Sequence, residues 1–164
     1  MLEQVGFILL QFFTGYLLQG FAFILFIYAF CKKKIDAKQY VIQSVIMTAA
    51  ILIIRNLPIN FGVHTLFNML ILILICVVMA KLPILQTIIG SLIVTILMFV
   101  VELIDVGFFT LIFGGMENYN NLMKDKFFKA YTAIPATILF LLITVFIYFK
   151  IVGRKVKSNA KADK

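Results

Sequence analysis

The charged residues of this 164-residue chain stand in short clusters that are separated by long apolar intervals. A transmembrane helix needs about 20 apolar residues, because roughly 30 Å of hydrocarbon is crossed at about 1.5 Å per residue. Four intervals meet this length, and the second reaches it if its helix continues past Arg55. The charge-free intervals are residues 4–31, 39–54, 56–80, 82–101 and 130–149. This pattern predicts an integral membrane protein.

The composition supports this prediction, since 63% of the residues are apolar and only 13% are charged. A soluble domain is about a quarter charged. We expect an all-α fold, a polytopic membrane helix bundle with about five transmembrane helices. Residues 1–151 would form one transmembrane domain, followed by a basic tail over 152–164. The predicted spans cover residues 5–30, 40–57, 62–80, 83–105 and 131–149.

The basic residues predict the orientation of these spans. Of the 15 Lys and Arg residues, 11 follow the first, third and fifth spans and 4 follow the second and fourth. Positive charge accumulates on the cytoplasmic side, which places the N-terminus outside and the C-terminus in the cytoplasm. The net charge of +8 therefore reflects membrane topology and predicts no nucleic-acid partner. Lysine and isoleucine, both encoded by AT-rich codons, are abundant, so we expect a bacterial cell membrane.

The segment between the fourth and fifth spans is harder to assign. Residues 106–114 are apolar but lie beyond a helix that has already crossed the membrane. We expect either a bend near Gly107 or a helix that projects above the bilayer. Residues 117–131 fit an amphipathic helix in the membrane interface or a solvated outer loop. The sequence leaves both alternatives open.

Polar side chains at membrane depth are costly and indicate function by default. Under the predicted topology, one group of them lies at or just below the outer face, and its members are Arg55, His64, Asn68, Glu102 and Asp105. A structural interpretation is an ion pair of Arg55 with Glu102 or Asp105 that holds three helices together. A functional interpretation is an outward-facing pocket for a small ligand, peptide or ion. His64 would add pH sensitivity to such a pocket.

No enzyme signature accompanies this cluster. The sequence has one histidine, no HExxH or CxxC metal-binding motif, no GxSxG elbow and no glycine-rich phosphate loop. Cys31 and Cys76 fall near the predicted cytoplasmic ends of helices, where thiols stay reduced. We therefore expect a non-enzymatic protein without metal or cofactor.

Several strings resemble a known membrane module. They are FGVHTLFNMLILILI (61–75), the K-x-P turn at 81–83, VVELIDVGFF (100–109) and NLMKDKFFKAYTAIPATILFLLI (121–143). Together they resemble the N-terminal membrane sensor region of GHKL-type sensor histidine kinases of low-GC Gram-positive bacteria, over most of residues 40–150. The sequence has no phosphoacceptor-histidine segment and no ATP-binding motif, so the resemblance implies a sensor-like module without a kinase domain. The matching strings contain His64, Asn68, Glu102 and Pro135.

We therefore expect a sensory or regulatory membrane protein that binds a signal at the outer polar cluster. It would act through its helices on a membrane partner such as a histidine kinase. The alternative is a small-molecule-binding subunit of a transporter, with a transporter component as partner. A third is a structural helper within a larger membrane complex. Stripes of small residues on the first and fourth spans also permit a homo-oligomer.

Overall fold

The computed structural model describes residues 15–57 and 61–162, and within these residues it is entirely helical with no strand. Three helical segments are long and apolar enough to cross a membrane, namely Ala37–Arg55, Ile84–Ile112 and Tyr131–Val152. Gly15–Phe30 and Val63–Val78 are shorter apolar helices. The described helices are α2 (Leu18–Phe30), α3 (Ala37–Arg55), α4 (Phe61–Val78), α5 (Ile84–Ile112), α6 (Met116–Leu122) and α7 (Lys126–Ala162). The predicted all-α class is confirmed.

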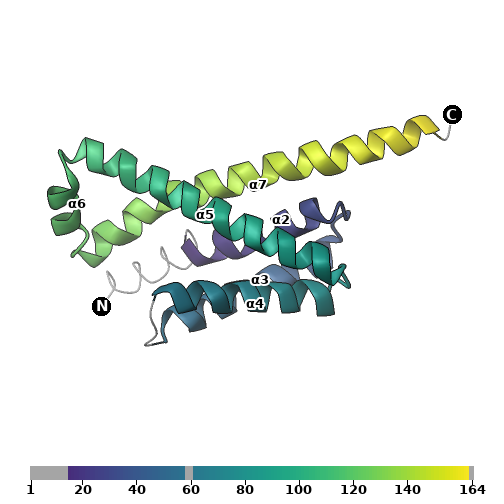
Figure 1. Cartoon of the computed structure of the whole chain (residues 1–164), viewed down its shortest axis with the longest axis horizontal. Helices are drawn as coiled ribbons and strands as arrows, with labels where there is room; N and C mark the ends of the chain where they lie inside the picture. Colours follow the sequence, from purple (N-terminus) through teal and green to yellow (C-terminus); the bar gives the residue numbers. More distant parts are fainter. Residues whose placement is uncertain (1–14, 58–60, 163–164) are drawn as a thin grey trace.

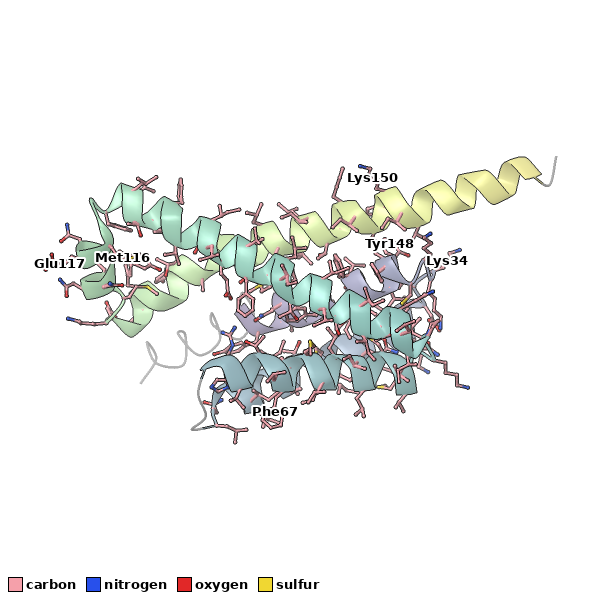
Figure 2. The ribbon with its side chains drawn as sticks, viewed as in Figure 1. Lys34, Phe67, Met116, Glu117, Tyr148 and Lys150 are labelled. Carbon is pink, nitrogen blue, oxygen red and sulfur yellow. The ribbon has the colours of Figure 1, made fainter. Side chains whose placement is uncertain are left out.

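The long helices run side by side in alternating directions (Figure 1). At one end, Lys33 Nζ donates a hydrogen bond to the carbonyl of Ala80, which joins the α2–α3 turn to the α4–α5 turn. The Ile35 N–H donates to the hydroxyl of Tyr148 on α7 at 3.2 Å, which brings α7 to the same end. We call this the lysine end. Figure 2 shows Lys34 and Tyr148 there, and Met116 and Glu117 of α6 at the opposite, α6 end.

Helix α2 is the centre of the bundle. Every residue from Ala22 to Ala29 is buried, and α2 packs against α3, α4, α5 and α7. A helix that is apolar on all sides is stable only when it is enclosed in this way. The Phe23 ring of α2 meets the Phe140 ring of α7 with centroids 5.4 Å apart. The tightest approach is at Gly20, where an added Cβ would lie only 2.3 Å from the Thr48 hydroxyl oxygen of α3.

Apolar side chains cover the outside of the bundle as well as its core, unlike in a soluble protein. Gln43 and Ser91 are completely buried, whereas Leu103 is 70% and Leu111 84% exposed. Phe149 is also largely exposed. Charged and amide side chains are seldom fully buried in water-soluble domains, and large continuous apolar surfaces are rare on them. This arrangement fits lipid around the bundle, as the apolar length of the helices also indicates.

The structure differs from the predicted boundaries of the fourth and fifth spans, on both sides of the segment that connects them. Helix α5 does not end at Gly107 but continues to Ile112, so its 29 residues extend about 44 Å. The apolar residues 106–112 therefore continue the fourth predicted span as helix. The short helix α6 follows. Helix α7 then begins at Lys126 and continues through Pro135 to Ala162, so the expected basic tail is helical as far as that residue.

The remaining predicted spans agree with described helices to within a few residues, except the first. The predicted span 40–57 corresponds to α3, and the predicted span 62–80 corresponds to α4. The first predicted span, 5–30, lies partly outside the described residues, which begin at Gly15.

Candidate binding cavity

The polar cluster predicted from the sequence lines a single cavity of about 610 Å³. Ligand pockets in proteins have volumes of roughly 300–1,000 Å³. The cavity lies toward the α6 end, because it is lined by the start of α2, the end of α3, the start of α4 and the later part of α5. All members of the predicted cluster line it, namely Arg55, His64, Asn68, Glu102 and Asp105. Side chains of this cluster come from three helices, α3, α4 and α5, which are far apart in sequence, and they share one space.

The length of α5 gives the depth of the acidic pair in a membrane. Glu102 follows Ile84, the first residue of α5, by eighteen positions, which is about 27 Å along the helix axis. Asp105 lies one turn further on, at about 31 Å. A hydrocarbon core of about 30 Å that begins near the start of α5 would therefore end close to these carboxylates. With the hydrocarbon core placed in this way, they would lie close to one surface of the membrane.

Arg55 makes its contacts with α2. Its guanidinium Nη2 donates a hydrogen bond to Gln19 Oε1 at 3.2 Å, and its Cζ lies 5.2 Å from the centroid of the Tyr16 ring. The second contact has the geometry of a cation–π interaction. Arg55 interacts electrostatically with Glu102, but within residues 15–57 and 61–162 it forms no direct salt bridge with either carboxylate. The arginine therefore joins α3 to α2, and the anticipated ion pair across to α5 is not formed.

Glu102 and Asp105 occupy one face of α5. Both side chains are partly buried and line the cavity. Across the described part of the chain, neither carboxylate accepts a hydrogen bond from another side chain or from the backbone. Two acceptor groups one turn apart on one helix are thus available to the contents of the cavity.

His64 and Asn68 occupy one face of α4, one turn apart. His64 Nδ1 and Asn68 Oδ1 are buried atoms that have no hydrogen-bond partner among the described residues. A buried polar atom without a partner costs about 1–3 kcal/mol. Both residues line the cavity, but these two atoms are covered by neighbouring atoms, so a polar molecule in that space would pair with them only after the side chains rotate.

Tyr119 is a cavity residue that the sequence reasoning missed. It lies on α6, is 5% exposed and lines the cavity from the side opposite α2. Burial raises the pKa of Tyr119 above its usual value of 10, and the nearby charge of Asp105 raises it further. The phenol therefore keeps its proton at neutral pH and remains a hydrogen-bond donor. Its only sequence signal is an aromatic residue in the otherwise polar stretch ENYNN at 117–121.

Helix α7 contributes a further wall that was not anticipated. Thr132, Ala133, Ala136 and Thr137 line the cavity. The Thr137 hydroxyl donates to the carbonyl of Ala133 at 2.9 Å. Pro135 faces the surface and is not part of this lining.

The cavity combines charge with apolar surface. Phe23, Leu72, Met98 and Phe99 supply apolar walls beside the guanidinium, the carboxylates, the imidazole and the amides. No group of three or more His, Cys, Asp or Glu side chains that could hold a metal ion occurs in the described residues. A mostly apolar space with a few converging polar groups is the usual form of a small-molecule site.

Comparisons with protein-family models, with curated proteins and with solved structures find no match to this chain. The resemblance to the membrane region of sensor histidine kinases therefore rests on its sequence strings alone.

Proposed function

We propose that this chain is a non-enzymatic sensory or regulatory protein of a bacterial cell membrane. In this proposal it crosses the membrane five times, with its N-terminus outside and its C-terminus in the cytoplasm. A small molecule or peptide enters the cavity from the outer side. Its binding changes the packing of the surrounding helices, and a partner membrane protein responds to that change.

The observation that carries the proposal is that residues from α2 to α7 line one cavity. A ligand that contacts several helices at once binds most tightly to one arrangement of them, and so shifts their equilibrium toward it. The partly exposed carboxylates of Glu102 and Asp105, which accept no hydrogen bond from the described residues, give a polar ligand acceptors in this cavity. A cavity of this kind, lined by several helices, fits detection better than a purely structural role.

Helix α7 supports a route from the cavity to the cytoplasm. Its segment around Thr137 lines the cavity, and the same helix continues without interruption to Ala162. Tyr148 fixes its middle to the α2–α3 turn at the lysine end. A displacement of the α7 wall would therefore be transmitted along a continuous helix to the side that carries most of the positive charge.

Crosslinking in native membranes, followed by capture of the chain and mass spectrometry, tests the proposed role. A sensor or regulator should bring down a histidine kinase or another signalling protein. Capture of an ATPase and a permease would instead support the alternative, a small-molecule-binding subunit of a transporter. Recovery of the chain with only itself would contradict both roles and leave a homo-oligomeric structural bundle.

A paired set of variants then tests the cavity. The double variant Glu102→Gln/Asp105→Asn should abolish the response of a reporter that depends on the captured partner, with membrane insertion unchanged. Glu117→Gln/Asp125→Asn removes the same charge from exposed residues outside the cavity lining, and it should leave the response intact. An unchanged response in the first variant would refute a sensing role for the cavity.

A further inference from the structure

We infer that the ligand of this cavity is an organic cation, a molecule with a protonated amine and an apolar body, whose charge lies against Glu102 and Asp105. This inference rests on the proposed function, because it names the ligand class for the same cavity. Four features of the lining support it: its charge balance, its supply of acceptors, its apolar walls and its volume.

The charges of the described lining residues do not balance. Glu102 and Asp105 contribute two carboxylates, whereas Arg55 contributes one guanidinium. That guanidinium already has Gln19 and the Tyr16 ring as its neighbours. An uncompensated charge near hydrocarbon is expensive, and pairing lowers the cost. One monovalent cation would bring the cavity to neutrality.

The two carboxylates supply the cavity with anionic acceptors that have no hydrogen-bond partner among the described residues. The carboxylates of Glu102 and Asp105 line the cavity and accept no hydrogen bond from the described residues, and Asn68 Oδ1 is a further acceptor that becomes available if its side chain rotates. His64 Nδ1 is an acceptor when the ring proton is on Nε2. A primary ammonium group has three N–H donors and no acceptor. The acceptors of the cavity and the donors of such a group are therefore complementary.

The rest of the lining fits an organic molecule better than an inorganic ion. Phe23 and Phe99 place aromatic rings in the wall, and aromatic faces attract organic cations. The volume of about 610 Å³ suits an apolar body of drug-like size. A bare metal ion would need a close set of ligands, and the described residues contain no such group.

A charge series on one apolar body tests the inference with the full chain in detergent or nanodiscs. The probes are 1-naphthylmethylamine, the neutral 1-naphthalenemethanol and the anionic 1-naphthoate, and binding is followed by naphthalene fluorescence. We expect the amine to bind at least tenfold more tightly than the alcohol, and the carboxylate more weakly than both. Glu102→Gln/Asp105→Asn should remove the preference for the amine. Glu117→Gln/Asp125→Asn should keep it, which controls for adsorption to protein and detergent.

Each outcome decides the inference. Equal affinity for amine and alcohol, or no binding of the amine, would overturn the cationic ligand class. Amine selectivity that persists in Glu102→Gln/Asp105→Asn would overturn the assignment to these carboxylates. Either failure leaves the proposed sensory function standing, because partner capture tests that function without any ligand.

Discussion

Replacement of Gly20 by alanine should separate α2 from α3. A Cβ at this position would lie 2.3 Å from Thr48 Oγ1 and 3.0 Å from both Ser44 O and Thr48 N. Ordinary van der Waals contact begins at 3.4 Å, so all three distances are too short. Two of the three atoms belong to the α3 backbone. Rotation of one side chain therefore cannot relieve the overlap, and the helices must move apart.

The size of the effect follows from these contacts. Overpacking of a well-packed interior costs about 1–3 kcal/mol. The Thr48 hydroxyl donates to the Ser44 carbonyl at 2.8 Å, and loss of that bond would add about 0.5–1.5 kcal/mol. Alanine is better than glycine inside a helix by about 0.5–1 kcal/mol, which offsets part of the cost. We expect Gly20→Ala to lower the free energy of unfolding by about 1–3 kcal/mol, roughly a 5- to 150-fold shift in the unfolding equilibrium.

Reversible unfolding by SDS titration in mixed micelles measures this change. Gly107→Ala is the matched control, because no atom lies within 4 Å of a Cβ added there. That variant should be as stable as the original chain or more stable by up to about 1 kcal/mol. Addition of Thr48→Ala to Gly20→Ala should restore part of the lost stability, since it removes the nearest atom but not the backbone. Equal stability of Gly20→Ala and Gly107→Ala would refute the close α2–α3 contact.

Two further predictions concern the buried core and use the same titration. Tyr28→Phe removes the buried hydroxyl that donates to Gln43 Oε1 at 3.0 Å, and it should lower the free energy of unfolding by about 1–2 kcal/mol. Tyr131 is exposed, so Tyr131→Phe should leave the free energy of unfolding unchanged. Equal losses in the two variants would contradict a role for the Tyr28–Gln43 hydrogen bond. Phe140→Ala opens a space beside α2, because Phe140 is fully buried, and it should lower the free energy of unfolding by about 3–5 kcal/mol. Phe149 lies on the exposed face, so Phe149→Ala should change the free energy of unfolding little. A loss as large as that of Phe140→Ala would argue against the assignment of Phe140 to the core.

Most of the helices could be predicted from the sequence, because the length of each interval without charged residues decides where a helix can cross a membrane. The lysine clusters at 32–34 and at 81 mark the α2–α3 and α4–α5 turns. Lys32 and Lys81 lie within these turns, and both have φ of 51°. The sequence left the form of residues 106–112 open, and it did not predict that residues 152–162 continue the last helix. Helix length beyond the membrane is limited by turns and packing, and neither charge nor hydropathy encodes it.

The site could be predicted only where its residues share a helix face. His64 and Asn68 are four positions apart and Glu102 and Asp105 three, so helical periodicity alone puts each pair together. Tyr119 could not be found in this way. It reaches the cavity because the chain reverses at Gly114 and Gly115, which have φ of 75° and 127°. Glycine readily adopts such values, but the direction of the reversal depends on the packing of α6 and α7.

Thiol accessibility tests most directly whether the polar cluster surrounds a water-accessible cavity. Thr95→Cys places a thiol in the cavity lining, and Leu103→Cys places one on the exposed apolar face of the same helix. Both are made in a chain in which Cys31 and Cys76 are replaced, and both are treated in membranes with a water-soluble, membrane-impermeant methanethiosulfonate. We predict rapid modification of Thr95→Cys, slowed by 1-naphthylmethylamine, and little modification of Leu103→Cys. Faster modification of Leu103→Cys, or no reaction at Thr95→Cys, would contradict the account.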